Sequence, residues 1–192
     1  GRGNGRRIAR RSRLGLVVRG GGARAGRTTR VVVGGVGMSG IARVLLARGV
    51  EVSGRDAKDL PVLAALRDLG ADTHVGYSVE HVIGAETVVV SAATREDNPE
   101  LAAARSAGQR VISRAEALAE LLQGRRAIAV AGTHGKTTTS WMLAVALEEC
   151  GTDPSYCIGG DSTATGVNGR HGGGALFVAG ADERDGSFLP CH

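Results

Sequence analysis

From residue 31 onward the chain alternates short apolar runs with segments whose apolar residues recur every three or four positions. The runs are typical of strands buried on both faces, and the helical spacing is typical of amphipathic helices. The pattern predicts strands at 30–35, 50–56, 71–76, 85–93, 109–113, 126–132, 155–160 and 175–180. It predicts helices at 38–49, 60–70, about 100–107, 114–123 and 136–150.

Alternating strands and helices predict an α/β fold with parallel strands and crossover helices. We expect a Rossmann-like parallel-sheet domain over residues 31–124, followed by the start of a P-loop-type ATPase domain over residues 125–192. The boundary is placed at 124–126, because one strand–helix series ends there and another begins. Residues 1–30 have no helical period and are expected to form a basic, disordered extension.

Composition and the lengths of the apolar runs indicate in which cellular compartment the protein is expected. Aromatic residues make up only 3% of the chain, so the core must consist of Val, Leu, Ala and Ile. The longest apolar run falls far short of the roughly 20 residues of a membrane span, and the basic N-terminus lacks the apolar stretch of a signal peptide. Cys150, Cys157 and Cys191 have the spacing of neither a disulfide framework nor a zinc site. These features predict a cytoplasmic protein without membrane contact.

The formal net charge of +5 is concentrated at one end of the chain. Residues 1–30 hold ten arginines and no acidic residue, so residues 31–192 carry a net charge of −5. A basic arm can bind nucleic acid. This one has no aromatic residue to stack on a base and no helical period, which argues against nucleic-acid binding.

A first glycine cluster follows the predicted strand at 30–35. Gly35, Gly37 and Gly40 form a G-x-G-x-x-G sequence that opens a helix, and Asp56 ends the next strand. Such glycines allow a diphosphate to approach the backbone at a helix N-terminus, and the carboxylate can accept hydrogen bonds from a ribose. The pattern is compatible with NAD, with another nucleotide, or with glycines that serve only tight strand–helix packing.

A second cluster, GTHGKT at 132–137, follows the predicted strand at 126–132. Its glycines can admit phosphate oxygens to the backbone, Lys136 can place a charge on the β- and γ-phosphates, and Thr137 can offer a hydroxyl to Mg²⁺. The spacing departs from a strict Walker A sequence, because Val130 stands where the outer glycine would be. Two phosphate-binding loops favour an enzyme that holds one nucleotide-linked substrate and cleaves ATP over an oxidoreductase.

Taken in order, these motifs resemble the Mur ligases of peptidoglycan synthesis, and within them the branch that adds L-alanine to UDP-N-acetylmuramate. The resemblance covers about residues 31–189 and rests on GGVGMSGIA, VSGRD, VVVSAA followed by DNPEL, VISRAEALAEL, AGTHGKTTT and ADERDGSFL. A sister branch, which reattaches a recycled peptide to UDP-N-acetylmuramate, shares the GTHGKTTT loop. It usually lacks the DGSF and SRAE sequences.

The resemblance implies two sites and their ligands. It implies a UDP-sugar site at Gly34, Gly35, Val36, Gly37, Met38, Ser39, Asp56 and Ser91. It implies an ATP site at Gly132, Thr133, His134, Gly135, Lys136, Thr137 and Thr138, with His134, Lys136 and Thr137 as catalytic candidates and Thr137 as a magnesium ligand. The implied reaction converts the lactyl carboxylate of UDP-N-acetylmuramate to an acyl phosphate, which L-alanine then attacks.

The chain departs from the family pattern at several positions. Val32 stands in place of the first glycine of the first cluster, Arg55 in place of a small residue before Asp56, and Ser162-Thr163 in place of Leu-Asn. Gly180 stands in place of a glutamate that binds magnesium, and Arg184 in place of a serine. The acidic residues Asp182, Glu183 and Asp185 remain. As bare sequence they are typical of a solvated acidic loop, and only the resemblance makes them site candidates.

Family members have three domains, and this sequence ends inside the second. We therefore expect the 192-residue chain to bind UDP-N-acetylmuramate weakly and not to turn over. Two other classes remain open: an NAD-binding Rossmann oxidoreductase, and a nucleotide-binding module without catalysis.

Overall fold

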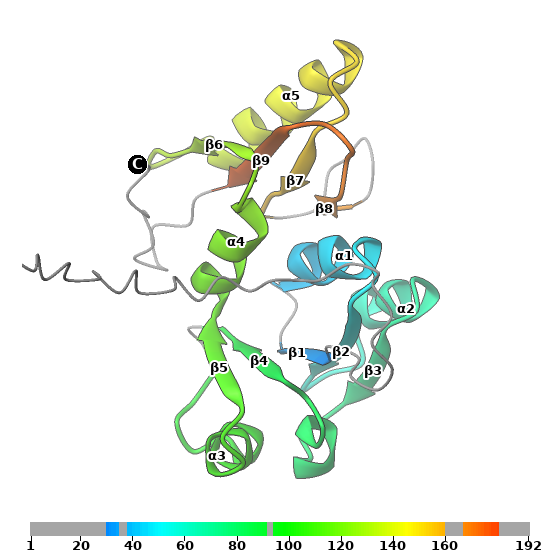
Figure 1. Ribbon diagram of the computed structural model, residues 1–192, viewed down its shortest axis with the longest axis vertical. Helices are drawn as coiled ribbons and strands as arrows, with labels where there is room; N and C mark the ends of the chain where they lie inside the picture. The colour runs from blue at the N-terminus through cyan, green and yellow to red at the C-terminus, as the bar shows by residue number, and fades with distance from the viewer. Residues whose placement is uncertain (1–29, 35–37, 92–93, 160–166, 181–192) are drawn as a thin grey trace, which may run out of the picture.

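The computed structural model describes residues 30–34, 38–91, 94–159 and 167–180 (Figure 1). Its strands form two sheets. The first contains β1 (Arg30–Gly34), β2 (Glu51–Asp56), β3 (Asp72–Val75), β4 (Thr87–Val90) and β5 (Arg110–Ser113) in the order β3-β2-β1-β4-β5. All of its strand pairs are parallel, as the apolar runs predict. The order reverses between β1 and β4, the point at which open α/β sheets bind ligands.

The second sheet contains β6 (Arg126–Val130), β7 (Ser155–Cys157), β8 (Gly169–Arg170) and β9 (Leu176–Gly180) in the order β6-β9-β7-β8. Strands β6, β9 and β7 are parallel, and the short β8 runs antiparallel to β7. The predicted α/β fold class is therefore confirmed. The sequence did not indicate β8, which lies in a segment read only as a glycine-rich connection.

The helices are α1 (Ser39–Ala47), α2 (Pro61–Asp68), α3 (Pro99–Ser106), α4 (Arg114–Leu122) and α5 (Lys136–Glu149), together with the short 3₁₀ helix η2 (Val79–Val82). Side-chain caps mark the N-terminal ends of α4 and α3. Ser113 and Glu116 form a reciprocal capping box at the start of α4, and the Asn98 side chain accepts the Glu100 and Leu101 N–H groups at the start of α3. All five α-helices lie where the pattern predicts them, and η2 was not predicted.

Helix α1 lies between the two sheets (Figure 1). One hydrophobic cluster joins its apolar residues to strands of the first sheet and to Cys157, Phe177 and Ala179 of the second. A smaller cluster lies on the other face of the first sheet, where η2 and α3 contribute Val82 and Ala104. The strands change sheet at residues 124–126, but the core continues across this point.

Backbone contact between α1 and β8 is unusually close. A Cβ atom at Gly169 would lie 2.3 Å from the Gly40 carbonyl oxygen, and one at Gly40 would lie 2.8 Å from the Asn168 carbonyl oxygen. The Asn168 Nδ2 donates to Ser39 Oγ at 2.8 Å in the same buried contact. Only glycine fits at both positions, so the second sheet holds the N-terminal end of α1 in place.

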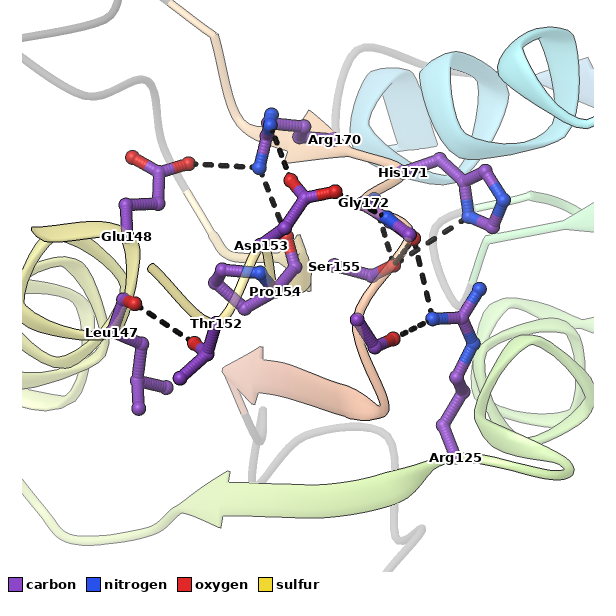
Figure 2. Close-up of polar contacts among 12 residues, drawn as sticks. Arg125, Leu147, Glu148, Thr152, Asp153, Pro154, Ser155, Arg170, His171 and Gly172 are labelled. Atoms are coloured by element: carbon purple, nitrogen blue, oxygen red, sulfur yellow. Dashed lines mark hydrogen bonds and ion pairs between the residues drawn. The ribbon is translucent and has the colours of Figure 1, made fainter. Parts of the chain in front are cut away.

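Polar contacts secure the turns beside β7 and β8 (Figure 2). Arg170 pairs with Glu148 at 3.1 Å and with Asp153 at 2.7 Å, joining β8 to the end of α5. The Gly172 N–H donates to Ser155 Oγ at 3.0 Å, and Arg125 donates to the carbonyls of Gly172 and Gly174. These bonds fix the junction between α4 and β6 against the second sheet.

In the part of the chain that the structure describes, no helix is both long and apolar enough to cross a membrane. Cys157 is buried and Cys150 exposed, both as free thiols. Burial raises the pKa of the Cys157 thiol to about 11, so it stays protonated at neutral pH.

Candidate functional site

A cavity of about 210 Å³ opens at the carboxyl ends of β2 and β4, on either side of the end of β1. It brings together two residues of the predicted UDP-sugar site, Asp56 and Ser91, which are far apart in the sequence. Its lining is completed by Arg55, Tyr77, Val88, Val89, Val90, Thr94, Asn98 and Leu101. The mixture of apolar walls with a few convergent polar groups is typical of a small-molecule site.

Asp56 lies at the end of β2 with its carboxylate only partly occupied. Its Oδ1 accepts the Lys58 N–H at 3.2 Å, and its backbone carbonyl accepts the Gly76 N–H at 2.8 Å. Ser91 follows β4, and its hydroxyl lies 3.3 Å from Thr94 Oγ1. Both side chains therefore retain hydrogen-bonding capacity at the rim of the cavity.

Arg55 and Glu100 form a buried ion pair in the wall of the same cavity. Their side chains are 6% and 0% exposed, and Arg55 Nε contacts Glu100 Oε2. Glu100 Oε1 also accepts the Ser78 N–H at 3.0 Å and lies 3.3 Å from His81 Nδ1. Burial lowers the pKa of Arg55, and the Glu100 carboxylate opposes this effect. The sequence showed Arg55 only as a departure from the family pattern, since its partner is 45 positions away.

The first glycine cluster is only partly described. Gly35, Val36 and Gly37 lie outside the described residues, and Gly34 pairs in register with Arg55. The Met38 side chain is 1% exposed in the core, and Ser39 Oγ is occupied by Asn168. Any contact of Met38 and Ser39 with a phosphate would therefore use their backbone N–H groups at the start of α1. For Gly40, the close contact with Asn168 supports the packing alternative.

The second cluster forms an exposed loop between β6 and α5. Gly132 has φ +149° and Gly135 has φ +76°, conformations that side-chain-bearing residues rarely adopt. Gly135 caps α5, and Lys136 is the first helical residue, so the free N–H groups of the first turn face the loop. The Lys136 Nζ donates to the Gly132 carbonyl across this loop. Thr133, His134, Thr137 and Thr138 are all exposed around it.

This arrangement fits a polyphosphate. A helix N-terminus, glycines that permit close approach and an adjacent lysine together provide N–H donors and positive charge. The predicted ATP-binding residues 132–138 are thus gathered around one loop at the start of α5.

The fit to Mg²⁺ is incomplete. Among the described residues, no group of three His, Cys, Asp or Glu side chains could hold a metal ion. Gly180 pairs in register with Val130, directly before the loop, so this position does lie beside the phosphate site. Without the family's glutamate there, Thr137 is the predicted magnesium ligand among the described residues. Asp182, Glu183, Asp185 and Arg184 lie outside the described residues, as do Ser162 and Thr163.

The geometry agrees with the comparison to known proteins. The sequence pattern of the Mur ligase family, catalytic domain, matches residues 27–126. The chain belongs to the Mur ligase family. This assignment supports the resemblance to the Mur ligases over the NAD-binding oxidoreductase.

Individual relatives of known name also match most of this chain. The UDP-N-acetylmuramate–L-alanine ligase of Nocardioides sp. is 58% identical over 166 residues, which is 86% of this chain and 37% of the relative. That of Kineococcus radiotolerans is 59% identical over 169 residues, 86% of this chain and 36% of the relative. The chain thus spans little more than a third of the length of these curated relatives.

Solved structures of Mur ligases share the fold. The UDP-N-acetylmuramate-alanine ligase of Thermotoga maritima has a TM-score of 0.73 and 29% identity, covering 79% of this chain and 36% of that one. The UDP-N-acetylmuramate:L-alanyl-gamma-D-glutamyl-meso-diaminopimelate ligase of Neisseria meningitides has a TM-score of 0.75 and 32% identity, covering 84% of this chain and 55% of that one. The fold is therefore common to both branches of the family.

Proposed function

We propose that this chain contributes the nucleotide-sugar site and the ATP loop of an enzyme that joins L-alanine to UDP-N-acetylmuramate. The observation that carries the proposal is the pair of sites: a cavity at the switch point of the first sheet and a phosphate-type loop at the start of α5. The relatives named as L-alanine ligases, at 54–59% identity, support this choice of branch. The enzyme would act in the cytoplasm, where its nucleotide substrates are made.

The proposed reaction needs both sites because a free carboxylate is a poor acyl donor. The γ-phosphoryl group of ATP passes to the lactyl carboxylate oxygen, which gives an acyl phosphate and ADP. The amine of L-alanine attacks the acyl carbon, the amide bond forms, and phosphate leaves as the amine loses a proton. Phosphoryl transfer asks the protein mainly for positioning and charge neutralisation.

The chain's own residues have corresponding roles. Residues 31–124 would hold the UDP-sugar, with Asp56 and Ser91 at the cavity rim and the N–H groups at the start of α1 toward the diphosphate. Residues 125–192 would begin the ATP-binding domain, where the backbone of the 132–135 loop and Lys136 hold the β- and γ-phosphates. Mg²⁺ supplies charge neutralisation when bound, and Thr137 would be its ligand from α5.

The recycling branch of the family is the second candidate, because the Neisseria enzyme has a comparable TM-score. Both branches use UDP-N-acetylmuramate, so its binding does not separate them. In the complete protein, phosphate release that depends on L-alanine would support the first proposal. Release that depends instead on the L-alanyl-γ-D-glutamyl-meso-diaminopimelate peptide would support the second.

Replacing Lys136 tests the ATP loop. We expect Lys136→Ala to weaken ATP binding about tenfold or more, because the loop loses its point charge opposite the phosphates. Isothermal titration of ATP into the 192-residue chain measures this change. Lys58→Ala is the matched control, since Lys58 is the only other lysine and is exposed in the first half of the chain. Equal ATP affinities for the two variants would contradict the proposed site.

Restoring the carboxylate at position 180 tests the magnesium site. A Cβ at Gly180 would meet its nearest neighbour, the Gly159 nitrogen, at 3.4 Å, so a side chain is admissible. We expect Gly180→Glu to increase the gain in ATP affinity on adding Mg²⁺ about tenfold, because a carboxylate then neutralises charge at the metal. Gly180→Gln matches the size without the charge and should resemble the unsubstituted chain. An equal magnesium effect in both variants would rule out a metal at this edge.

A further inference from the structure

His171 connects α1 to the second sheet through one ring nitrogen. It follows β8, and its Nδ1 lies 3.5 Å from Ser155 Oγ at the start of β7 (Figure 2). The same Nδ1 lies 3.5 Å from Nε of Arg48, the residue that ends α1. Arg48 also donates through Nη2 to the Leu121 carbonyl of α4 at 2.9 Å. The ends of α1 and α4 therefore meet the second sheet at His171 and Arg48.

Nδ1 of His171 can make these contacts only while it carries no proton. An arginine Nε is always a donor, so its contact with the imidazole nitrogen requires the nitrogen lone pair. The Ser155 hydroxyl, which accepts the Gly172 N–H at 3.0 Å, can direct its own hydrogen to the same lone pair. A protonated imidazole has two N–H donors and no acceptor. Protonation therefore places two donors against each other between α1 and β8.

Positive charge surrounds the His171 ring and is only partly balanced. In the part of the chain that the structure describes, neither Arg48 nor Arg125 pairs with a carboxylate, and both donate to backbone carbonyls instead. The acidic group that acts on the ring is Asp153, which is itself paired with Arg170 at 2.7 Å. Burial lowers the pKa of His171, and the charges of the two unpaired arginines lower it further, against the opposing effect of Asp153. The surroundings therefore favour the neutral ring.

We propose that His171 is a pH-sensitive switch in the contact between α1 and the second sheet. The neutral ring holds the contact, and a proton taken up from solvent at Nδ1 loosens it. That proton removes the acceptor for Arg48 Nε and adds a third positive charge beside Arg48 and Arg125. The switch belongs to the fold and does not depend on which ligands the two candidate sites bind.

The direction of the pH effect follows from proton linkage. An unfolded histidine binds its proton at the ordinary pKa of 6.5, whereas folded His171 binds it only at lower pH. Between these two values the unfolded chain holds more protons than the folded chain, so stability falls as the pH falls. The contribution of His171 is therefore present above about pH 6.5 and is lost progressively below it.

Denaturant titration at about pH 7.5 and about pH 5.5 tests the switch in the unsubstituted chain and in His171→Asn. Asparagine keeps an acceptor oxygen near the position of Nδ1 but cannot take up a proton. On acidification, the unfolding constant of the unsubstituted chain should rise about threefold to tenfold more than that of His171→Asn. His134→Asn is the matched control, because it removes an exposed histidine of the 132–135 loop. It should keep the full pH dependence of the unsubstituted chain.

Titration of the histidine ring signals by NMR tests the role of the arginine directly. The His171 signal, assigned by its absence in His171→Asn, should titrate at a higher pH in Arg48→Gln than in the unsubstituted chain. Glutamine removes the positive charge and keeps an N–H donor for the Leu121 carbonyl. Arg67→Gln, which changes an exposed arginine in the last turn of α2, should leave the His171 midpoint where it is.

Three results would overturn the inference. The first is an equal loss of stability on acidification in the unsubstituted chain and in His171→Asn. The second is a His171 midpoint that does not move in Arg48→Gln. The third needs no variant to fold in quantity: a His171 signal of the unsubstituted chain that titrates at or above the midpoint of the denatured chain would show that the folded junction does not oppose the proton.

Discussion

Gly169→Ala is expected to lower the free energy of unfolding by about 3 kcal/mol, because it forces two backbone segments apart. The new Cβ would lie 2.3 Å from the Gly40 carbonyl oxygen and 2.6 Å from Gly40 Cα. Neither atom belongs to a side chain that can rotate away, so α1 must move from β8. The Ser39–Asn168 hydrogen bond of 2.8 Å would be lost with this movement. Denaturant titration followed by circular dichroism measures the change.

Gly159→Ala is the matched control for this substitution. A Cβ at Gly159 meets no atom within 4 Å, and the backbone there is not in the left-handed region. The same glycine-to-alanine change should therefore alter stability by less than about 0.5 kcal/mol. Similar midpoints for the two variants would show that α1 and β8 do not approach each other as closely as described. Because the N–H groups at the start of α1 are proposed to face the diphosphate, Gly169→Ala should weaken UDP binding in parallel with the loss of stability.

The strands and helices could be predicted because each is marked by a local pattern. The apolar runs of β4 and β9 are buried on both faces of parallel sheets, where alternation is not needed. Helix ends are equally local: Gly49 and Gly70, with φ +76° and +95°, stop α1 and α2 at the predicted positions. The short β8 has no such mark, because its two residues are held by pairing with β7 and by contact with α1.

The phosphate-type loop and the cavity residues Asp56 and Ser91 could be predicted from the sequence. The buried residues around them could not. Glycine spacing identifies a loop such as 132–135, since the left-handed conformation at Gly135 is a local requirement. Met38 is buried in the hydrophobic cluster that includes residues of both sheets, and no local pattern indicates such long-range packing. The same holds for Arg55, whose partner Glu100 reaches it only when α3 packs below the sheet. The boundary at residues 124–126 stays a prediction.

Removing the Glu100 carboxylate should have the other large effect on stability. We expect Glu100→Ala to lower the free energy of unfolding by about 3–5 kcal/mol, because it leaves the buried Arg55 charge without its partner. The Ser78 N–H, now 3.0 Å from Glu100 Oε1, would lose its acceptor as well. Chemical denaturation measures the loss. Arg55→Met with Glu100→Gln should recover most of it, since that pair of changes removes both charges and keeps an acceptor for Ser78.

Glu96→Ala provides the comparison on the surface. Glu96 pairs with Arg105 of α3 at 2.6 Å, but both side chains are mostly exposed. The hydrogen bond and charge of Arg105 lower the pKa of Glu96, yet solvent screens such a pair. The denaturation midpoint of Glu96→Ala should therefore match that of the unsubstituted chain. A shift as large as that of Glu100→Ala would mean that removing any carboxylate near α3 destabilises the protein. Burial of the Arg55–Glu100 pair would then not be the cause of the loss of stability.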